Sequence, residues 1–268
     1  MISRLYNWIE RQSIPRINWL KTIYCNFRML PFRQARLLPI LVYGNPALNS
    51  LSGNIKFDCP IKKGLVKINK QETFAPSLQT GRTQICIYGT IVIKGEVLIG
   101  CGTKILVAHS GCLTLCNNTR ITDFCNIDCW SKITIGEESR IAHRCQIMDS
   151  NHHYILDEDT RKIPNDNKSV VIGKYCWICN SSSVLPGAVI PDYSIVSSYS
   201  IVNKDISSWG NHIIVGGIPI KLLKTSVTRI FNKDFELRLC EFFSQGEKDY
   251  YEVSPCVDIN SLIRNNHE

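Results

Sequence analysis

Aliphatic side chains recur at every sixth position in the stretch between residues 172 and 205. The aliphatic positions are Ile172, Ile178, Val184, Ile190, Val196 and Val202, and the fifth place of each hexad holds a small residue, namely Cys176, Ser182, Ala188, Ser194 and Ser200. Because six is three times the strand period of two, every opening residue returns to the same side of an extended chain. The pattern predicts one short strand and one corner per hexad, with coils of hexads stacked as parallel strands.

The same period extends toward the N-terminus with interruptions. It starts weakly near Gly81, and its aliphatic positions are then Ile91, Ile93, Val97, Ile99, Leu115, Ile121, Ile127, Ile135, Ile141 and Ile147. A shift of two residues before Ile135 preserves the alternation of inward and outward side chains. We therefore expect three parts: a lead-in over residues 1–80, the coiled domain over residues 81–206, and an exit segment over residues 207–268.

Helical spacing of apolar residues appears only near the two ends. Residues 1–30 predict two short amphipathic helices separated by Pro15, with apolar positions at Leu5, Trp8 and Ile9 and then at Ile17, Leu20, Ile23 and Tyr24. Prolines and glycines over residues 31–60 favour an irregular segment with short strands. A last amphipathic helix is expected over residues 234–243.

The hexads stop at Asp149 and resume near residue 170. The intervening residues 150–169 are polar and rich in turn formers, so they predict a loop that leaves the coils at one corner. A loop of this length inside a regular repeat is often functional. The adjacent His152 and His153 favour a functional loop here.

Composition narrows the class of protein. The chain has 268 residues, of which 44% are apolar, and can bury a sizeable core. No apolar run is long enough to span a bilayer, and Arg4, Glu10 and Arg11 interrupt any signal-peptide core. These features predict a cytoplasmic protein.

Thirteen cysteines raise the question of metal ions or disulfides. The hexad phase explains many of them, since Cys125, Cys145 and Cys176 occupy the small fifth place. Cysteine is small and buries well. We therefore expect neither zinc nor structural disulfides.

Charge is concentrated at the N-terminus. The formal net charge is +8, and residues 1–40 contain seven Lys and Arg against Glu10 alone, which gives +6. This basic segment could contact an anionic membrane surface or an anionic sugar carrier, and a solvated helix face is an equally good interpretation. No feature indicates a nucleic-acid partner.

Three motifs near the end of the repeat resemble those of the hexapeptide-repeat acyltransferases. They are Ile172-Gly173 with Trp177-Ile178, then Val202-Asn203-Lys204-Asp205, then Gly217-Ile218-Pro219-Ile220-Lys221. The resemblance covers about residues 80–225. It implies an all-β fold, a left-handed parallel β-helix with short terminal helices, and a homotrimer. The periodicity itself predicts parallel coils but not their handedness.

Within that family the chain is most similar to sugar O-acetyltransferases of the maltose, galactoside and capsular-polysaccharide kind. The resemblance implies acetyl transfer from acetyl-CoA to a sugar hydroxyl, in surface polysaccharide biosynthesis and without a metal. The family carries its catalytic histidine in a loop after a coil, which here matches Asp149-Ser150-Asn151-His152-His153. The spacing from Asp149 favours His153 as the general base over His152, and Asp149 is expected to orient the ring.

The family binds CoA in a groove along the last coils, between two subunits. Carried over by position, the contacts are Trp177, Asn180, Ser198, Asn203 and Lys204, with Lys221 and Lys224 near the nucleotide phosphates. One departure is Ser197-Ser198-Tyr199, which replaces the family's usual Gly-Ala-Gly. The side chains of Ser197 and Tyr199 would narrow the path of the pantetheine arm.

Two other functions fit the same repeat. One is an N-acyltransferase acting on an amino sugar, and the other is a non-catalytic hexapeptide-repeat scaffold, which would not need the loop. A γ-class carbonic anhydrase needs two of its three zinc-binding histidines five residues apart, and this chain lacks that spacing. The sequence does not identify the acceptor sugar.

Overall fold

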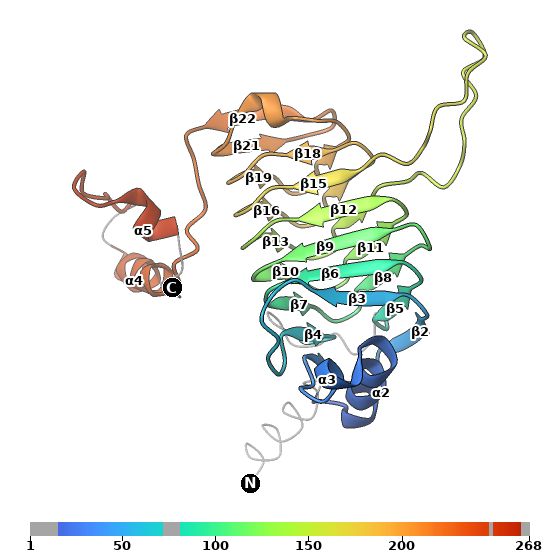
Figure 1. The fold of residues 1–268 in the computed structure, drawn as a ribbon. Coiled ribbons are helices and arrows are strands. Elements are labelled where there is room, and N and C mark those ends of the chain that lie inside the picture. Colours follow the sequence, from blue (N-terminus) through green and yellow to red (C-terminus); the bar gives the residue numbers. More distant parts are fainter. Residues whose placement is uncertain (1–15, 72–80, 247–248, 264–268) are drawn as a thin grey trace, which may run out of the picture.

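The computed structural model describes residues 16–71, 81–246 and 249–263. Within these residues the strands form three sheets that stack along one axis as the faces of a prism (Figure 1). Each coil of the chain contributes one short strand to each face in turn. The prism is a left-handed parallel β-helix, the all-β fold that was expected.

Successive coils supply the strands of each sheet in stacking order. The nine-stranded sheet contains β1 (Ile40–Val42), β4 (Val66–Ile68), β7 (Val97–Ile99), β10 (Thr119–Ile121), β13 (Arg140–Ile141), β16 (Trp177–Ile178), β19 (Ile195–Val196), β21 (Ile213–Gly216) and β22 (Lys221–Thr225). The seven-stranded sheet contains β2 (Ala47–Leu51), β5 (Gln84–Ile87), β8 (Lys104–Val107), β11 (Asn126–Cys129), β14 (Gln146–Met148), β17 (Ser183–Val184) and β20 (Ile201–Val202). The six-stranded sheet contains β3 (Asn54–Phe57), β6 (Thr90–Lys94), β9 (Cys112–Cys116), β12 (Lys132–Ile135), β15 (Val170–Ile172) and β18 (Val189–Ile190).

The hexad positions pair as the repeat predicts. Ile127 of β11 lies beside Ile147 of β14, and Ile172 of β15 lies beside Ile190 of β18. The opening aliphatic residues from Leu115 to Val202 are at most 1% exposed, so they form one continuous interior column. Burial of this column is the main favourable contribution to folding.

Each regular corner combines a left-handed residue with a small buried one. Tyr175 and Tyr193 have φ values of 54° and 58°, and the fifth-place residues that follow them, Cys176 and Ser194, are 0% exposed. The fifth-place side chain therefore turns into the prism at the bend, where little room remains. This explains why cysteine, serine, alanine and threonine alternate at that place.

Replacing Cys176 by leucine should lower the free energy of unfolding by about 1–3 kcal/mol, because extra methylene groups overpack a closed corner. Lys174→Leu is the matched control, since it adds the same side chain at an exposed position of the same corner. Urea denaturation of both variants measures the difference. Equal midpoints for the two variants would contradict this role of the fifth place.

The prism begins earlier than predicted. Strands β1, β2, β3 and β4 lie before residue 72 and pair in parallel with the coils that follow, so the expected boundary at residue 81 is wrong. The connections after β3 and β4 are longer than a regular corner, and these first coils do not follow the hexad period. Ile40 and Val42 are nevertheless fully buried in the common core.

Two helices close the N-terminal end of the prism (Figure 1). They are α2 (Trp19–Met29) and the short α3 (Phe32–Ala35). Helix α2 corresponds to the second predicted helix, whereas the first predicted helix lies outside the described residues. Asn18 caps α2, since its side chain accepts a hydrogen bond from the backbone N–H of Lys21.

After β20 the chain adds two more strands to the nine-stranded sheet, so the prism also extends past the expected boundary at residue 206. A short 3₁₀ helix, η1 (Ser207–Trp209), precedes β21, and β22 returns antiparallel to it. Helix α4 (Lys233–Ser244) closely matches the predicted C-terminal helix, and α5 (Ile259–Ile263) follows. No helix in the described part of the chain has the length and apolar character needed to cross a membrane.

Candidate active site at the excursion loop

The excursion loop, residues 150–169, leaves the prism between β14 and β15. This is the edge where the chain passes from the seven-stranded to the six-stranded sheet, and the loop extends far beyond it (Figure 1). Two hydrogen bonds join its arms at the base: the N–H of Lys168 donates to the carbonyl of Asp149 at 2.9 Å, and the hydroxyl of Ser150 donates to Asp166 at 2.9 Å. The base of the loop is therefore fixed to the coils.

His152 lies at this base and is held by the coil below. Its Nε2 is 2.8 Å from Oδ2 of Asp128, a residue of β11. Oδ1 of the same carboxylate accepts the indole N–H of Trp130 at 2.8 Å, and the Trp130 ring contacts the imidazole edge-on with centroids 4.9 Å apart. The backbone N–H of His152 donates to Ser150. One ring nitrogen, one ring edge and the backbone of His152 are thus all restrained.

The backbone of His152 adopts a left-handed conformation, with φ of 63°. Histidine is one of the residues that tolerate this region, and residues in such conformations are enriched at functional sites. The imidazole side chain of His152 remains 32% exposed, whereas that of Asp128 is 15% exposed. The ring is therefore ordered but still reachable from solvent.

Asp149 does not orient a histidine, contrary to the prediction. It is fully buried, and its carboxylate accepts the backbone N–H groups of Trp130, Ser131 and Lys132 at 2.7, 2.9 and 2.6 Å. Asp149 is the third residue of its hexad. The third-place Asp192 likewise accepts a backbone N–H from the preceding coil, so these carboxylates belong to the corner architecture.

His153 occupies a different position from its neighbour. It lines a cavity of about 290 Å³ between the loop and the last coils, together with Asn151, Ile155, Pro164, Asn165, Asp166, Lys168, Leu185, Pro186 and Asn203. The two histidines therefore separate in space: one is held by Asp128, and the other faces a cavity large enough for part of a substrate.

The predicted CoA residues are spread over several parts of the prism. Asn203 lines the cavity and Lys204 follows it on the same edge, with its Nζ 5.3 Å above the Trp209 ring. Asn180 and Ser198 lie at the edge between the nine-stranded and seven-stranded sheets, and Lys221 and Lys224 are exposed on β22. Within one chain these residues do not form a single groove.

The ring of Trp177 already contacts another side chain of the same chain. The guanidinium of Arg229 lies 4.7 Å from the centroid of the Trp177 ring and 4.9 Å from that of Phe231. Trp177 belongs to the nine-stranded sheet, away from the edge that carries His152. The structure therefore does not bring Trp177 to the cavity with Asn203.

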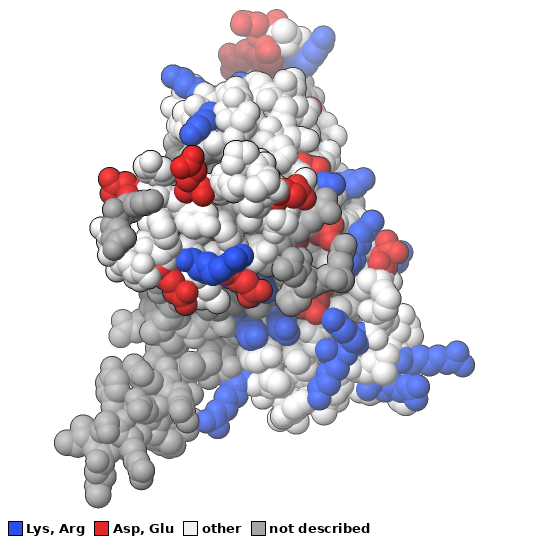
Figure 2. Space-filling view, turned by 90° about the vertical axis from the view of Figure 1, so that its left-hand side faces the viewer, with Lys and Arg blue, Asp and Glu red and all other residues white. Residues whose placement is uncertain are grey.

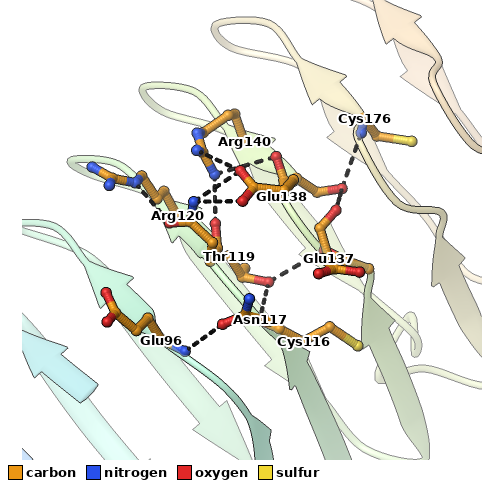
Figure 3. A network of polar contacts seen from close by, with 12 residues as sticks. Glu96, Cys116, Asn117, Thr119, Arg120, Glu137, Glu138, Arg140 and Cys176 are labelled. Atoms are coloured by element: carbon orange, nitrogen blue, oxygen red, sulfur yellow. Dashed lines mark hydrogen bonds and ion pairs between the residues drawn. The ribbon is translucent and has the colours of Figure 1, made fainter. Parts of the chain in front are cut away.

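A second polar cluster lies on the edge between the six-stranded and nine-stranded sheets (Figure 3). Arg140 pairs with Glu138 at 3.1 Å, and both Glu138 oxygens accept from the Asn118 amide. Burial lowers the pKa of Arg140 to about 10, against the opposing effect of Glu138, so the guanidinium remains charged near neutral pH. This network joins two successive corners and is separate from the loop.

Sequence reasoning missed Asp128 and Trp130. A signal was present, because Asp128 is the sole carboxylate at a second, outward-facing hexad place between Leu115 and Asp205. It also pairs in register with Met148, which directly precedes the corner at Asp149. A carboxylate in that place lies directly beneath the start of the loop.

The buried thiols are unsuited to act as nucleophiles. Burial raises the pKa of Cys145 to about 11 and that of Cys176 to about 12, so their thiolates are scarce at neutral pH. We expect a thiol reagent at neutral pH to label the exposed Cys240 and Cys256 in the folded protein, while Cys145 and Cys176 react only after unfolding. Peptide mass spectrometry measures the order, and rapid labelling of Cys176 in the folded protein would contradict it.

No family model matches the chain. The chain is 27% identical over 144 residues to WbbJ of Escherichia coli K12, named as a lipopolysaccharide biosynthesis O-acetyl transferase, and the match covers 51% of this chain and 72% of WbbJ. It is 29% identical to an uncharacterised protein of the cps region of Klebsiella pneumoniae, over 82% of this chain and 96% of that protein. A polysialic acid O-acetyltransferase of Escherichia coli O1:K1 is 27% identical, over 50% of this chain and 41% of that enzyme.

One solved structure that resembles the chain is that of the polysialic acid O-acetyltransferase OatWY. The TM-score is 0.47 and the identity 18%, with 78% of this chain and 85% of the other covered.

Proposed function

We propose that this chain, which resembles the hexapeptide-repeat acyltransferases, transfers an acetyl group from acetyl-CoA to a hydroxyl group of a sugar in a surface polysaccharide or its precursor. The observation that carries the proposal is the restrained imidazole of His152 at the base of the excursion loop, directly before His153, which lines an open cavity. The sequence relatives named for O-acetyl transfer to lipopolysaccharide and to polysialic acid support the substrate class.

The geometry favours His152 as the general base instead of His153. The Asp128 carboxylate accepts the Trp130 indole N–H through one oxygen and lies at hydrogen-bonding distance from His152 Nε2 through the other. A carboxylate in this position accepts an N–H, so we assign the ring proton to Nε2 and leave the lone pair of Nδ1 available. The hydrogen bond fixes both the tautomer and the orientation of the imidazole, so the ring does not have to reorient before it accepts a proton.

The reaction is a direct transfer. The sugar hydroxyl gives its proton to Nδ1 of His152 as its oxygen attacks the thioester carbonyl carbon. The new C–O bond forms, the C–S bond breaks, and the imidazolium returns the proton to the departing CoA sulfur. Atoms and charges balance without an acyl-enzyme, in agreement with the high pKa values of the buried thiols.

Asn203 and His153 are proposed to contact substrate, because both line the cavity beside the loop base. The exposed Lys204, Lys221 and Lys224 remain candidates for the CoA phosphates, as point charges on the last coils. Trp177 is not included, since Arg229 covers its ring. Assembly as a homotrimer, which the family resemblance implies, would place further residues beside the cavity.

The direct test is turnover. Purified protein is incubated with acetyl-CoA and a panel of neutral, sialylated and amino sugars, and the release of free CoA thiol is followed together with the mass of the sugar. A gain of one acetyl group on a hydroxyl supports the proposal. Acetylation of amino groups alone would point to N-acyl transfer, and an absence of thiol release with every polysaccharide precursor would favour a scaffold.

Asp128→Asn tests the positioning residue. The amide can still accept from Trp130 but can donate its N–H to His152, which favours the wrong tautomer, so we expect kcat to fall by about 10²-fold or more while KM for acetyl-CoA changes little. Steady-state kinetics at saturating acceptor measures the effect. A fall in kcat together with a rise in KM and a lower urea midpoint would instead indicate a structural role.

A further inference from the structure

Helix α2 closes the first coil with a side that combines the polar Thr22 and Asn26 with the apolar Cys25 and Met29. Thr22, Cys25, Asn26 and Met29 are the buried residues of α2, and the amide of Asn26 donates to the carbonyl of Ile40 at 2.7 Å while its oxygen accepts the N–H of Ile40 at 3.1 Å. Thr22 accepts the N–H of Val42 at 3.0 Å. These side chains take the place of a neighbouring strand beside β1, so the helix cannot rotate without exposing the edge of the sheet.

As a consequence the largest apolar residues of the helix face outward. Its exposed fractions are Trp19 47%, Leu20 83%, Ile23 47%, Tyr24 54% and Phe27 46%, and the adjoining Phe32 is 71% exposed with its ring centroid 5.9 Å from that of Phe27. We call these six residues the α2 face. The caps of stacked-coil proteins normally have a polar outer surface, so this apolar one is unusual and marks a contact site.

Cations surround the α2 face. Arg16, Arg28, Arg33 and Arg36 are exposed, and Lys63 lies 5.3 Å from the centroid of the Trp19 ring. The sequence contains no Asp or Glu between residues 11 and 57. Figure 2 shows Lys and Arg side chains gathered around the end of the molecule where α2 and α3 lie. The Asp and Glu side chains that the same view shows lie further along the prism, away from this end.

The combination of an apolar face and surrounding cations limits which kinds of partner can bind there. A second copy of the chain would offer an apolar surface but would bring like charges together, which is unfavourable. A partner that is both apolar and anionic is required. We propose that the α2 face binds the surface of a bilayer that contains anionic lipids, with the helix lying in the plane of the interface.

The side chains present suit that environment. Trp19 and Tyr24 have an apolar ring with a polar tip and favour the headgroup level, while Leu20 and Ile23 reach the acyl boundary. The long stems of Arg28 and Arg33 allow their guanidinium groups to reach lipid phosphates beside the helix. The prism would then stand on its N-terminal end, with the excursion loop several coils away from the lipid.

The test uses the full-length chain and vesicles made of equal parts of phosphatidylglycerol and phosphatidylcholine, or of phosphatidylcholine alone. We expect sedimentation with the anionic vesicles and much weaker binding to the neutral ones. The change of Arg28, Arg33 and Arg36 to glutamine should weaken partitioning roughly a hundred-fold, since each cation near the surface contributes about a factor of five. Leu20→Gln with Ile23→Gln should weaken it about ten-fold or more.

A matched control removes the same charge elsewhere. Lys132→Gln, Lys162→Gln and Lys233→Gln lower the net charge equally but lie on β12, on the excursion loop and on α4, several coils from the α2 face, so binding should remain within about two-fold of the parent, since screening confines a surface attraction to about one Debye length. Equal loss in this control would overturn the proposal, as would the absence of binding by the full chain. If the protein bound vesicles only after deletion of residues 2–15, the α2 face would be covered by the chain itself and the proposal would be overturned. If the protein instead self-associated with rising concentration and Leu20→Gln abolished this association, the partner would be a second copy and the proposal would again be overturned.

Discussion

The change of His152 to alanine should lower kcat by about 10²–10⁴-fold, the range that a positioned general base contributes. The physical reason is that the sugar hydroxyl then attacks the thioester without a group that removes its proton. The fold should be unaffected, because the imidazole is partly exposed and its one side-chain partner, Asp128, also has the Trp130 indole. Thiol release at saturating acetyl-CoA and acceptor measures kcat.

His153→Ala is the matched control for that experiment. It removes the same side chain from the adjacent position, where the ring lines the cavity and no hydrogen bond to it is described. We expect a rise in KM for one substrate and a smaller change in kcat. If His153→Ala instead abolished turnover and His152→Ala did not, the assignment of the base to His152 would be wrong and the preference drawn from motif spacing would be right.

The second large effect concerns stability. Asp149→Ala should lower the free energy of unfolding by about 3 kcal/mol or more, because it leaves three backbone N–H groups without their acceptor at about 1–3 kcal/mol each. Turnover should fall as well, since the corner that carries Trp130 would lose its support. Urea unfolding gives the first quantity and steady-state assays the second.

Two companion variants separate these effects. Asp149→Asn keeps one carbonyl oxygen in the same place and should lose about half as much stability, because one or two of the three N–H groups keep an acceptor. Asp166→Ala removes the carboxylate that accepts from Ser150 on the outer side of the loop base and should cost about 1 kcal/mol. An Asp149→Ala protein as stable as the parent would show that water replaces the carboxylate without penalty.

The regular coils could be predicted from sequence because each place of the hexad has one geometric requirement that only one kind of residue meets. Ile121 and Ile178 are buried since every sixth side chain points inward, and Cys176 is small since the corner is closed. The first coils escaped prediction because the connections after β3 and β4 are long and break the period, although Ile40 and Val66 still pair in register. Register between distant segments is not expressed in local spacing.

The candidate site was predictable only in part, for the same reason. The break in the hexads located the loop and its two histidines. The partner of His152 could not be read from the loop itself, since Asp128 lies 24 residues earlier and reaches it only through the stacking of β11 beneath β14. The nearer carboxylate, Asp149, seemed suitable in sequence but points into the corner.

Helix α2 shows a third limit of pattern reasoning. The period of its apolar residues predicted an amphipathic helix, and a helix is present, but its buried side carries Thr22 and Asn26 beside Cys25 and Met29, while the predicted apolar positions Leu20, Ile23 and Tyr24 are exposed. Their hydrogen bonds to β1 satisfy backbone groups that would otherwise be unpaired at the end of the sheet. The need for these hydrogen bonds arises from the sheet edge at β1 and cannot be read from the hydrophobic pattern of the helix itself.

The closed neck of the excursion loop has a consequence for the divergence of such proteins. Since the arms are joined by Lys168 to Asp149 and by Ser150 to Asp166, residues 154–163 can be lengthened, shortened or exchanged while every rung of the prism keeps its neighbours. Under the proposed function, the contacts of the tip with an acceptor sugar can therefore change while His152 stays fixed at the base of the loop. Grafting the tip from a related chain, with the accepted sugar as the readout, tests this consequence.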